Sequence, residues 1–158
     1  MYKRQEHGLI VSLTDLGDSV AIWGSSAIDI PNSESAWNGQ ANTAAIILAG
    51  GLLSEAAGVC DTSTSGGQTD WYLPSIQELE MIYDNLHVIN KVLTTVGSLA
   101  ELIYSNEPVR SYYWSSTEYS HDWALTLDFW SHSVDVTSKY GTQWALFGGE
   151  RVRGIRAF

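Results

Sequence analysis

The stretch "DFWSHSVDVTSKYGTQW", residues 128–144, carries the pattern on which the interpretation of the fold depends. Residues 125–129, and again residues 134–136, place a hydrophobic residue at every second position. Successive side chains of a strand point to opposite faces of its sheet. We therefore predict a strand over 124–129 in which Leu125, Leu127 and Phe129 are buried. Thr126, Asp128 and Trp130 are predicted to point outward.

A second strand is predicted in the same stretch, with Val134 and Val136 continuing the buried set. The residues predicted opposite them are of unrelated types: Ser133, Asp135 and Thr137. Four large aromatic residues lie on this outward side or in its flanking loops: Trp123, Trp130, Tyr140 and Trp144. Rigid aromatic residues among Ser, Thr, Gly and Asp are typical of recognition surfaces. The alternative is a half-exposed antiparallel sheet whose aromatic residues cover neighbouring backbone, and composition alone does not separate the two.

The remaining sequence predicts an α+β domain spanning residues 1–158. Strands are expected at 8–13 and 19–23, and a helix is expected from Asn42 to Gly58, interrupted at Gly50–Gly51. The segment "LPSIQELEMIYDNL" contains a capping box, Ser75 and Glu78, at the start of a second helix. A looser helical stretch runs to Gly97, and short strands follow Pro108 to the end of the chain.

Composition excludes several classes of function. The net charge of −10 argues against nucleic-acid binding, which requires a basic surface. The single cysteine, Cys60, follows a mainly apolar helix and is predicted to be a buried structural thiol. No apolar run approaches the roughly 18 residues that membrane insertion requires. The opening "MYKRQ" back-translates to a sequencing-library transposon end, which suggests that residues 1–5 are not native and that an N-terminal part is missing.

Three segments in order resemble one family of bacterial and phage domains: "DWYLPSIQELEMIY" (70–83), "YYWSSTEYS" (112–120) and "RVRGIRAF" (151–158). The family is that of the domain at the C-terminus of a Legionella collagen-like adhesin. The resemblance implies a C-type lectin-like fold with two helices packed on short antiparallel sheets. It also implies a variable protein of a diversity-generating retroelement, in which error-prone reverse transcription rewrites adenines near the 3′ end of the gene.

The resemblance accounts for an outward face of unrelated residue types over an ordered scaffold. Codons for Ser, His, Asp, Thr, Tyr and Gly arise from the asparagine codons AAY by changes at adenines alone. The chain has six asparagines up to Asn106 and none afterwards. Tryptophan does not arise in this way, so Trp123, Trp130 and Trp144 require another template codon or are fixed.

The resemblance implies that residues about 119–147 bind a ligand, either a protein or a cell-surface component. The expected contact residues are Ser120, His121, Asp122, Trp123, Thr126, Asp128, Trp130, Ser131, Ser133, Asp135, Thr137, Tyr140, Thr142 and Trp144. The expected location is a phage virion or a bacterial cell surface. The alternative function is an adhesin domain of fixed specificity that binds a glycan or a host protein. The oligomeric state is left open, although an exposed sheet edge could promote pairing.

The sequence offers little support for calcium-dependent sugar binding, catalysis or zinc binding. We therefore expect no catalytic residue, metal ligand or cofactor. Calcium-dependent sugar binding needs clustered oxygen ligands, but Glu107–Pro108 is followed by Val109 and no Trp-Asn-Asp element occurs. His121 and His132 lack a partner spaced for a catalytic triad, or further ligands for zinc. The closing Arg151, Arg153 and Arg156 are expected to pair with acidic residues, Glu118 among them, and so to fix the last strand.

Overall fold

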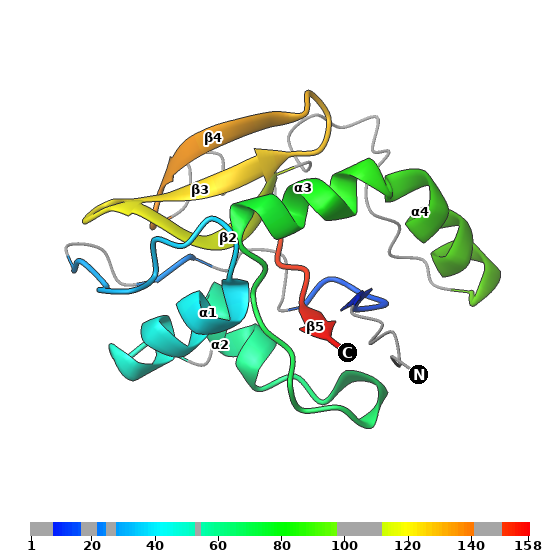
Figure 1. The fold of residues 1–158 in the computed structure, drawn as a ribbon, viewed down its shortest axis with the longest axis horizontal. Coiled ribbons are helices and arrows are strands. Elements are labelled where there is room, and N and C mark those ends of the chain that lie inside the picture. The colour runs from blue at the N-terminus through cyan, green and yellow to red at the C-terminus, as the bar shows by residue number, and fades with distance from the viewer. Residues whose placement is uncertain (1–7, 17–21, 25–27, 53–54, 98–111, 141–149) are drawn as a thin grey trace, which may run out of the picture.

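The computed structural model describes residues 8–16, 22–24, 28–52, 55–97, 112–140 and 150–158. Figure 1 shows the helices and strands that these residues form. In chain order they are β1 (Leu9–Val11), α1 (Gly39–Leu48), α2 (Ala56–Asp61), the 3₁₀ turn η1 (Ser65–Gly67), α3 (Ile76–Asp84), α4 (Leu86–Thr95), β2 (Tyr112–Ser120), β3 (Trp123–Asp128), β4 (Ser133–Ser138) and β5 (Ile155–Ala157).

The described strands form two antiparallel sheets. The first and last strands, β1 and β5, pair with each other, so the two ends of the described chain lie side by side (Figure 1). The other sheet has the order β2-β3-β4, and short turns join its neighbouring strands. The register of β3 and β4 sets Leu125 opposite Val136 and Thr126 opposite Asp135.

Two hydrophobic clusters pack on opposite faces of the three-stranded sheet. Tyr113 and Leu127 face α3 and belong to one cluster with Leu79. Trp114, the next residue of β2, points the other way and packs with residues of α1 and α2. In Figure 1, α1 and α2 lie together below the sheet, whereas α3 runs along it. Both faces of β2 are therefore buried, which explains why "YYWSST" reads as a nearly continuous buried run.

The start of α3 confirms the predicted capping box. The Ser75 hydroxyl accepts from the Glu78 backbone N–H, and the Glu78 carboxylate accepts from the Ser75 backbone N–H at 2.8 Å. Glu78 also accepts from the Tyr72 hydroxyl and from the Gly39 backbone N–H, both at 3.0 Å. One carboxylate thus caps α3 and ties it to the start of α1.

The mixed α+β class is confirmed, but the described residues contain four helices, where the family resemblance implies two. The predicted helix from Asn42 to Gly58 is two helices, because the backbone leaves the helical path at Gly50, where φ is +96°. The first of them begins earlier than predicted, with Asn38 as its N-cap, and Asn42 is a buried interior residue. Of the strand predicted at 19–23, residues 19–21 lie outside the described residues.

The prediction of which face is outward is wrong for the middle of β3 and for β4. Thr126, Asp128 and Thr137 are buried, whereas Val134 and Val136 are 44% and 46% exposed. The period of two is correct, and Leu127 and Phe129 are buried as predicted, but the face of Thr126 is covered as well. Because α3 packs on β2 and β3, the valines of β4 lie at the margin of the sheet.

The closing arginines do hold the end of the chain, as predicted, but not through Glu118. Arg151 and Arg153 pair with Asp15 at 3.1 and 2.7 Å. Arg156 forms a two-point contact with Asp70 at 2.6 and 2.8 Å. The last strand is therefore tied to residues near the start and the middle of the chain.

Candidate ligand-binding surface

The turn between β2 and β3 presents a group of exposed side chains. We call this group the turn surface, and its members are Tyr119, Ser120, His121, Asp122, Trp123 and Tyr140. Its three aromatic residues are strongly exposed, with Tyr119 and Tyr140 at 63% and Trp123 at 44%. Tyr140 is held close to the turn because the preceding residue, Lys139, donates its backbone N–H to the Asp122 carbonyl at 3.0 Å. At the turn itself, His121 Nδ1 lies 3.1 Å from Asp122 Oδ1.

A buried ion pair lies directly beneath the turn surface. The Lys139 ammonium group contacts the Glu118 carboxylate, and both side chains are almost completely buried. Lys139 Nζ also donates to the backbone carbonyls of His121 (3.0 Å) and Ile28 (2.8 Å). It lies 4.9 Å from the centre of the Trp23 ring, within the range of a cation–π contact. One ammonium group thus joins the turn, the end of β4 and a loop from the first quarter of the chain.

Glu118 completes this support from the other side. Its carboxylate accepts from the Ile30 backbone N–H at 3.0 Å and from the Ser33 hydroxyl at 3.0 Å. Two buried charges carry a large desolvation cost, which is compensated only when further hydrogen bonds satisfy them. Here both groups have such partners, so the turn rests on a fixed polar base.

Little in the amino-acid sequence indicates this base. Glu118 was expected to pair with an arginine, and Lys139 was not singled out at all. The one local signal is the strand period: Lys139 lies two residues after Thr137, on the side that the alternation assigns to the same face. Tyr119 lies inside the predicted region, 119–147, but is not among the contact residues named from the sequence.

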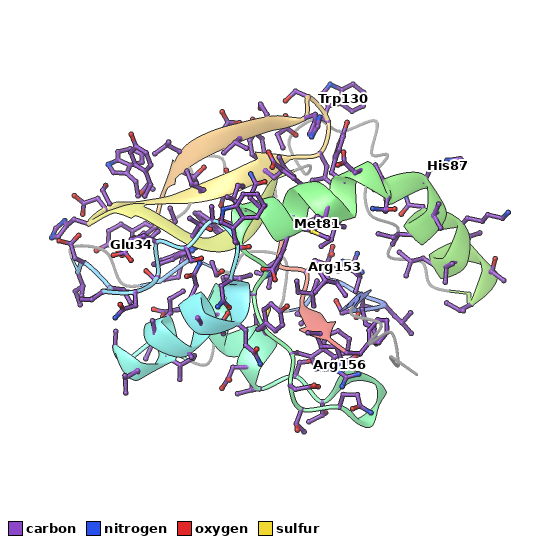
Figure 2. All side chains as sticks on the ribbon, in the orientation of Figure 1. Glu34, Met81, His87, Trp130, Arg153 and Arg156 are labelled. Carbon is purple, nitrogen blue, oxygen red and sulfur yellow. The ribbon has the colours of Figure 1, made fainter. Side chains whose placement is uncertain are left out.

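Trp130 lies at the other end of β3 and β4, in the hairpin that joins them. It is 55% exposed, as predicted, and Figure 2 shows it at the tip of the hairpin. The Asp128 carboxylate accepts from the backbone N–H groups of Trp130 (2.9 Å) and Ser131 (3.3 Å), and from the Ser131 hydroxyl. Asp128 therefore closes the turn rather than facing a ligand.

Hydrogen bonds continue from this turn along β4. The hydroxyls of Ser131 and Ser133 lie 2.9 Å apart, and Ser133 donates to the Asp135 carboxylate at 3.0 Å. The hairpin is further held against α3, because the His132 ring stacks on the Tyr83 ring with their centres 3.8 Å apart. The side chains of Ser131, Ser133 and Asp135 are thus engaged with one another within the hairpin.

Thr126 and Thr137 form a third, internal group. Both are buried, and their hydroxyl oxygens lie 2.8 Å apart. These side chains satisfy each other between β3 and β4 and are not available on the surface. Each hydroxyl keeps a partner in the low-dielectric interior, which avoids the cost of an unsatisfied polar group.

The structure therefore separates the predicted contact residues into groups instead of one face. Ser120, His121, Asp122, Trp123 and Tyr140 gather at the turn surface, whereas Trp130 and Ser131 lie at the hairpin tip. Six residues of strand separate the two ends, a span of roughly 17 Å at the usual rise per residue. Thr142 and Trp144 lie outside the described residues.

The described residues contain no cluster of three or more His, Cys, Asp or Glu side chains arranged to hold a metal ion. Within the same ranges, no helix has the length and apolar character needed to cross a membrane. The Cys60 thiol is buried, as predicted. Its burial is the main cause that raises the pKa of the thiol, and the negative charge of the nearby Asp61 carboxylate raises it further. That shift is opposite to the one a nucleophilic thiol requires.

The family model of the Lcl C-terminal domain matches residues 18–146, which is most of the chain and includes the turn surface and the hairpin. No curated protein matches the chain significantly.

Proposed function

Because this chain belongs to the Lcl C-terminal domain family, we propose that it is a surface adhesin-like domain that binds a protein or cell-surface ligand through the turn surface. The mechanism is association on a rigid scaffold, without catalysis. Its setting is a phage virion or a bacterial cell surface.

The observation that carries this proposal is the combination of exposed aromatic side chains with a buried polar base. Tyr119, Trp123 and Tyr140 offer large apolar areas with few rotatable bonds, so little conformational entropy is lost when they are covered. The Lys139–Glu118 pair holds the backbone beneath them, which reduces the ordering that binding would otherwise require.

We also propose that the protein is a variable protein of a diversity-generating retroelement and that it has a C-type lectin-like fold. The pairing of β1 with β5, and the three-stranded sheet between two layers of helices, support the fold. Ser120, His121 and Asp122 support diversification, since they are exposed at a turn where the side chain can change without altering the core. Buried Thr126, Asp128 and Thr137 do not fit that role.

Binding is tested by selecting peptides from a random display library against the domain. The selected peptides are then measured against Trp123→Ala and against Trp130→Ala, a matched exposed tryptophan at the other end of the sheet. We expect Trp123→Ala to weaken binding about tenfold or more, since a central aromatic contact contributes on the order of 2 kcal/mol. Trp130→Ala should change the affinity little. The reverse result would place the ligand at the hairpin tip.

Diversification is tested in the DNA that follows the gene. A near-identical template repeat that differs only at adenines, beside a reverse transcriptase gene, is the expected result. The differing codons should include those of Ser120, His121 and Asp122 and should omit those of Thr126 and Thr137. A complete locus without such a repeat would leave an adhesin of fixed specificity as the function.

A further inference from the structure

The lysine and arginine side chains of the described residues are almost all engaged within the molecule. Lys139 is buried against Glu118, and the three closing arginines pair with Asp15 and Asp70. The exception in the described ranges is Lys91, an exposed residue of α4. In Figure 1, α4 lies at the far side of the molecule from the turn between β2 and β3. No lysine or arginine side chain of the described residues is therefore presented at the turn surface, and the histidine there, His121, lies 3.1 Å from the Asp122 carboxylate.

Acidic side chains do surround that surface. Asp29 and Glu34 are exposed on the loop that the buried ion pair holds in place, and Asp122 is exposed in the turn itself. The loop is close to the turn because the carbonyls of Ile28 and His121 share one ammonium group, and because the Glu118 backbone N–H donates to the Ser33 carbonyl at 2.9 Å. Figure 2 shows Glu34 beside the same end of the sheet. We call Asp29, Glu34 and Asp122 the acidic rim.

This arrangement combines two features that select the same kind of partner. Carboxylates attract cationic groups and repel anionic ones, and the net charge of −10 adds to that field over a longer range. Exposed aromatic rings attract arginine and lysine by cation–π contact, most strongly when the ring is tryptophan. Trp123 directly follows Asp122. Tyr119 follows Glu118, whose backbone N–H holds the loop at Ser33 next to Glu34, so one basic side chain can meet a ring and a carboxylate together.

We propose that the turn surface binds a basic protein segment, rich in arginine or lysine, and that the acidic rim selects it. The inference rests on the proposed function, because it names the partner of that same surface. It excludes sulfated glycans and other polyanions as ligands there.

The test measures the affinity of a labelled nona-arginine peptide by fluorescence anisotropy. The rim variant carries Asp29→Asn, Glu34→Gln and Asp122→Asn. The control variant carries Asp61→Asn, Glu80→Gln and Asp84→Asn, which remove the same charge from other parts of the surface. We expect the rim variant to bind about tenfold more weakly and the control to remain within about threefold of the unmodified domain, since distant exposed charges are screened. Trp123→Ala should also weaken binding.

Equal weakening by the rim and control variants would overturn the proposal, because attraction would then be diffuse. Absence of peptide binding, or binding of heparin with the same dependence on Trp123, would also overturn it. The peptides selected from the display library separate this inference from the proposed function. If they require Trp123 but are not enriched in arginine and lysine, the surface binds ligands and only the basic partner is wrong. If none requires Trp123, the proposed function fails as well.

Discussion

Lys139 is a charged residue whose side chain is completely buried. Its ammonium group replaces hydration with the Glu118 carboxylate and the carbonyls of Ile28 and His121. Such a pair is costly to bury, and losing one partner leaves an uncompensated charge in the interior. Lys139 therefore supports the shape of the turn surface, although it takes no part in the contact itself.

Replacing Lys139 by Met should lower the free energy of unfolding by about 3–5 kcal/mol, because Glu118 would remain buried without its counter-charge. The double variant Lys139→Met with Glu118→Leu should recover part of that loss. Urea unfolding followed by tryptophan fluorescence measures both. A loss for the single variant of less than about 1 kcal/mol, the value of an exposed pair, would contradict the burial of this site.

A second prediction at this scale concerns alkaline pH. Burial raises the pKa of the Cys60 thiol above its usual 9.0, and burial together with Glu78 raises the pKa of Tyr72 above its usual 10.0. Below about pH 8 these groups are protonated in both states, so they do not affect stability. Above it, the unfolded chain releases protons that the folded protein retains, and stability falls by up to about 1.4 kcal/mol per pH unit for each group.

Urea unfolding across this alkaline range should show that decline, and Cys60→Ala should remove its earliest part. A free energy of unfolding that stays constant as the pH rises through 10 would show that these groups titrate normally in the folded state.

Cys60 and the Ser75–Glu78 box were predictable from local sequence. The Lys139–Glu118 pair was not, because only the register of β2, β3 and β4 brings the two residues together.

At the scale of the element, the hairpin of β3 and β4 shows what alternation can and cannot predict. The period of two located both strands. It also placed Leu127 and Phe129 correctly on the buried face against α3. It could not show that the opposite face, shared by Trp114 and Thr126, is covered as well, or that the margin of the sheet is not. Thr126 and Asp128 are consequently buried and bonded within the hairpin, whereas Val134 and Val136 are exposed.

Asp128 and Trp130 are only two residues apart, but truncation of their side chains should affect stability differently. Asp128→Ala removes the acceptor of the turn's N–H groups and should cost about 1–3 kcal/mol. Trp130→Ala removes an exposed ring and should change stability by less than about 0.5 kcal/mol, as is usual for surface positions. Thermal unfolding of the two variants decides the point. A larger loss for Trp130→Ala would place that ring in the core.

At the scale of the whole molecule, the ends of the described chain are joined by charge as well as by strand pairing. Asp15 accepts from Arg151 and Arg153, and the Tyr113 hydroxyl donates to it at 3.3 Å.

The order of helices and strands and the mixed α+β class could be predicted from the hydrophobic period and the turn residues. The number of helices could not, because the break at Gly50–Gly51 can loosen one helix or end it.

Asp15→Asn should destabilise the domain by about 2 kcal/mol, because buried Arg153 would lose its counter-charge while Asp15 itself is partly exposed. Asp70→Asn, which removes an exposed partner of Arg156, is the matched control and should have a smaller effect. Urea unfolding compares the two. Equal losses would mean that the pairing at Asp15 contributes no more than a surface contact.

Ligand binding at the turn surface is the central proposal for this domain. The seven tryptophans provide a direct measurement, since each indole N–H gives its own signal in a ¹H–¹⁵N NMR spectrum that single Trp→Phe variants assign. The domain is titrated with the tightest peptide from the display library. We predict that the Trp123 signal shifts in proportion to occupancy while those of Trp130 and buried Trp114 remain in place. Shifts confined to Trp130, with Trp123 unchanged, would contradict the account.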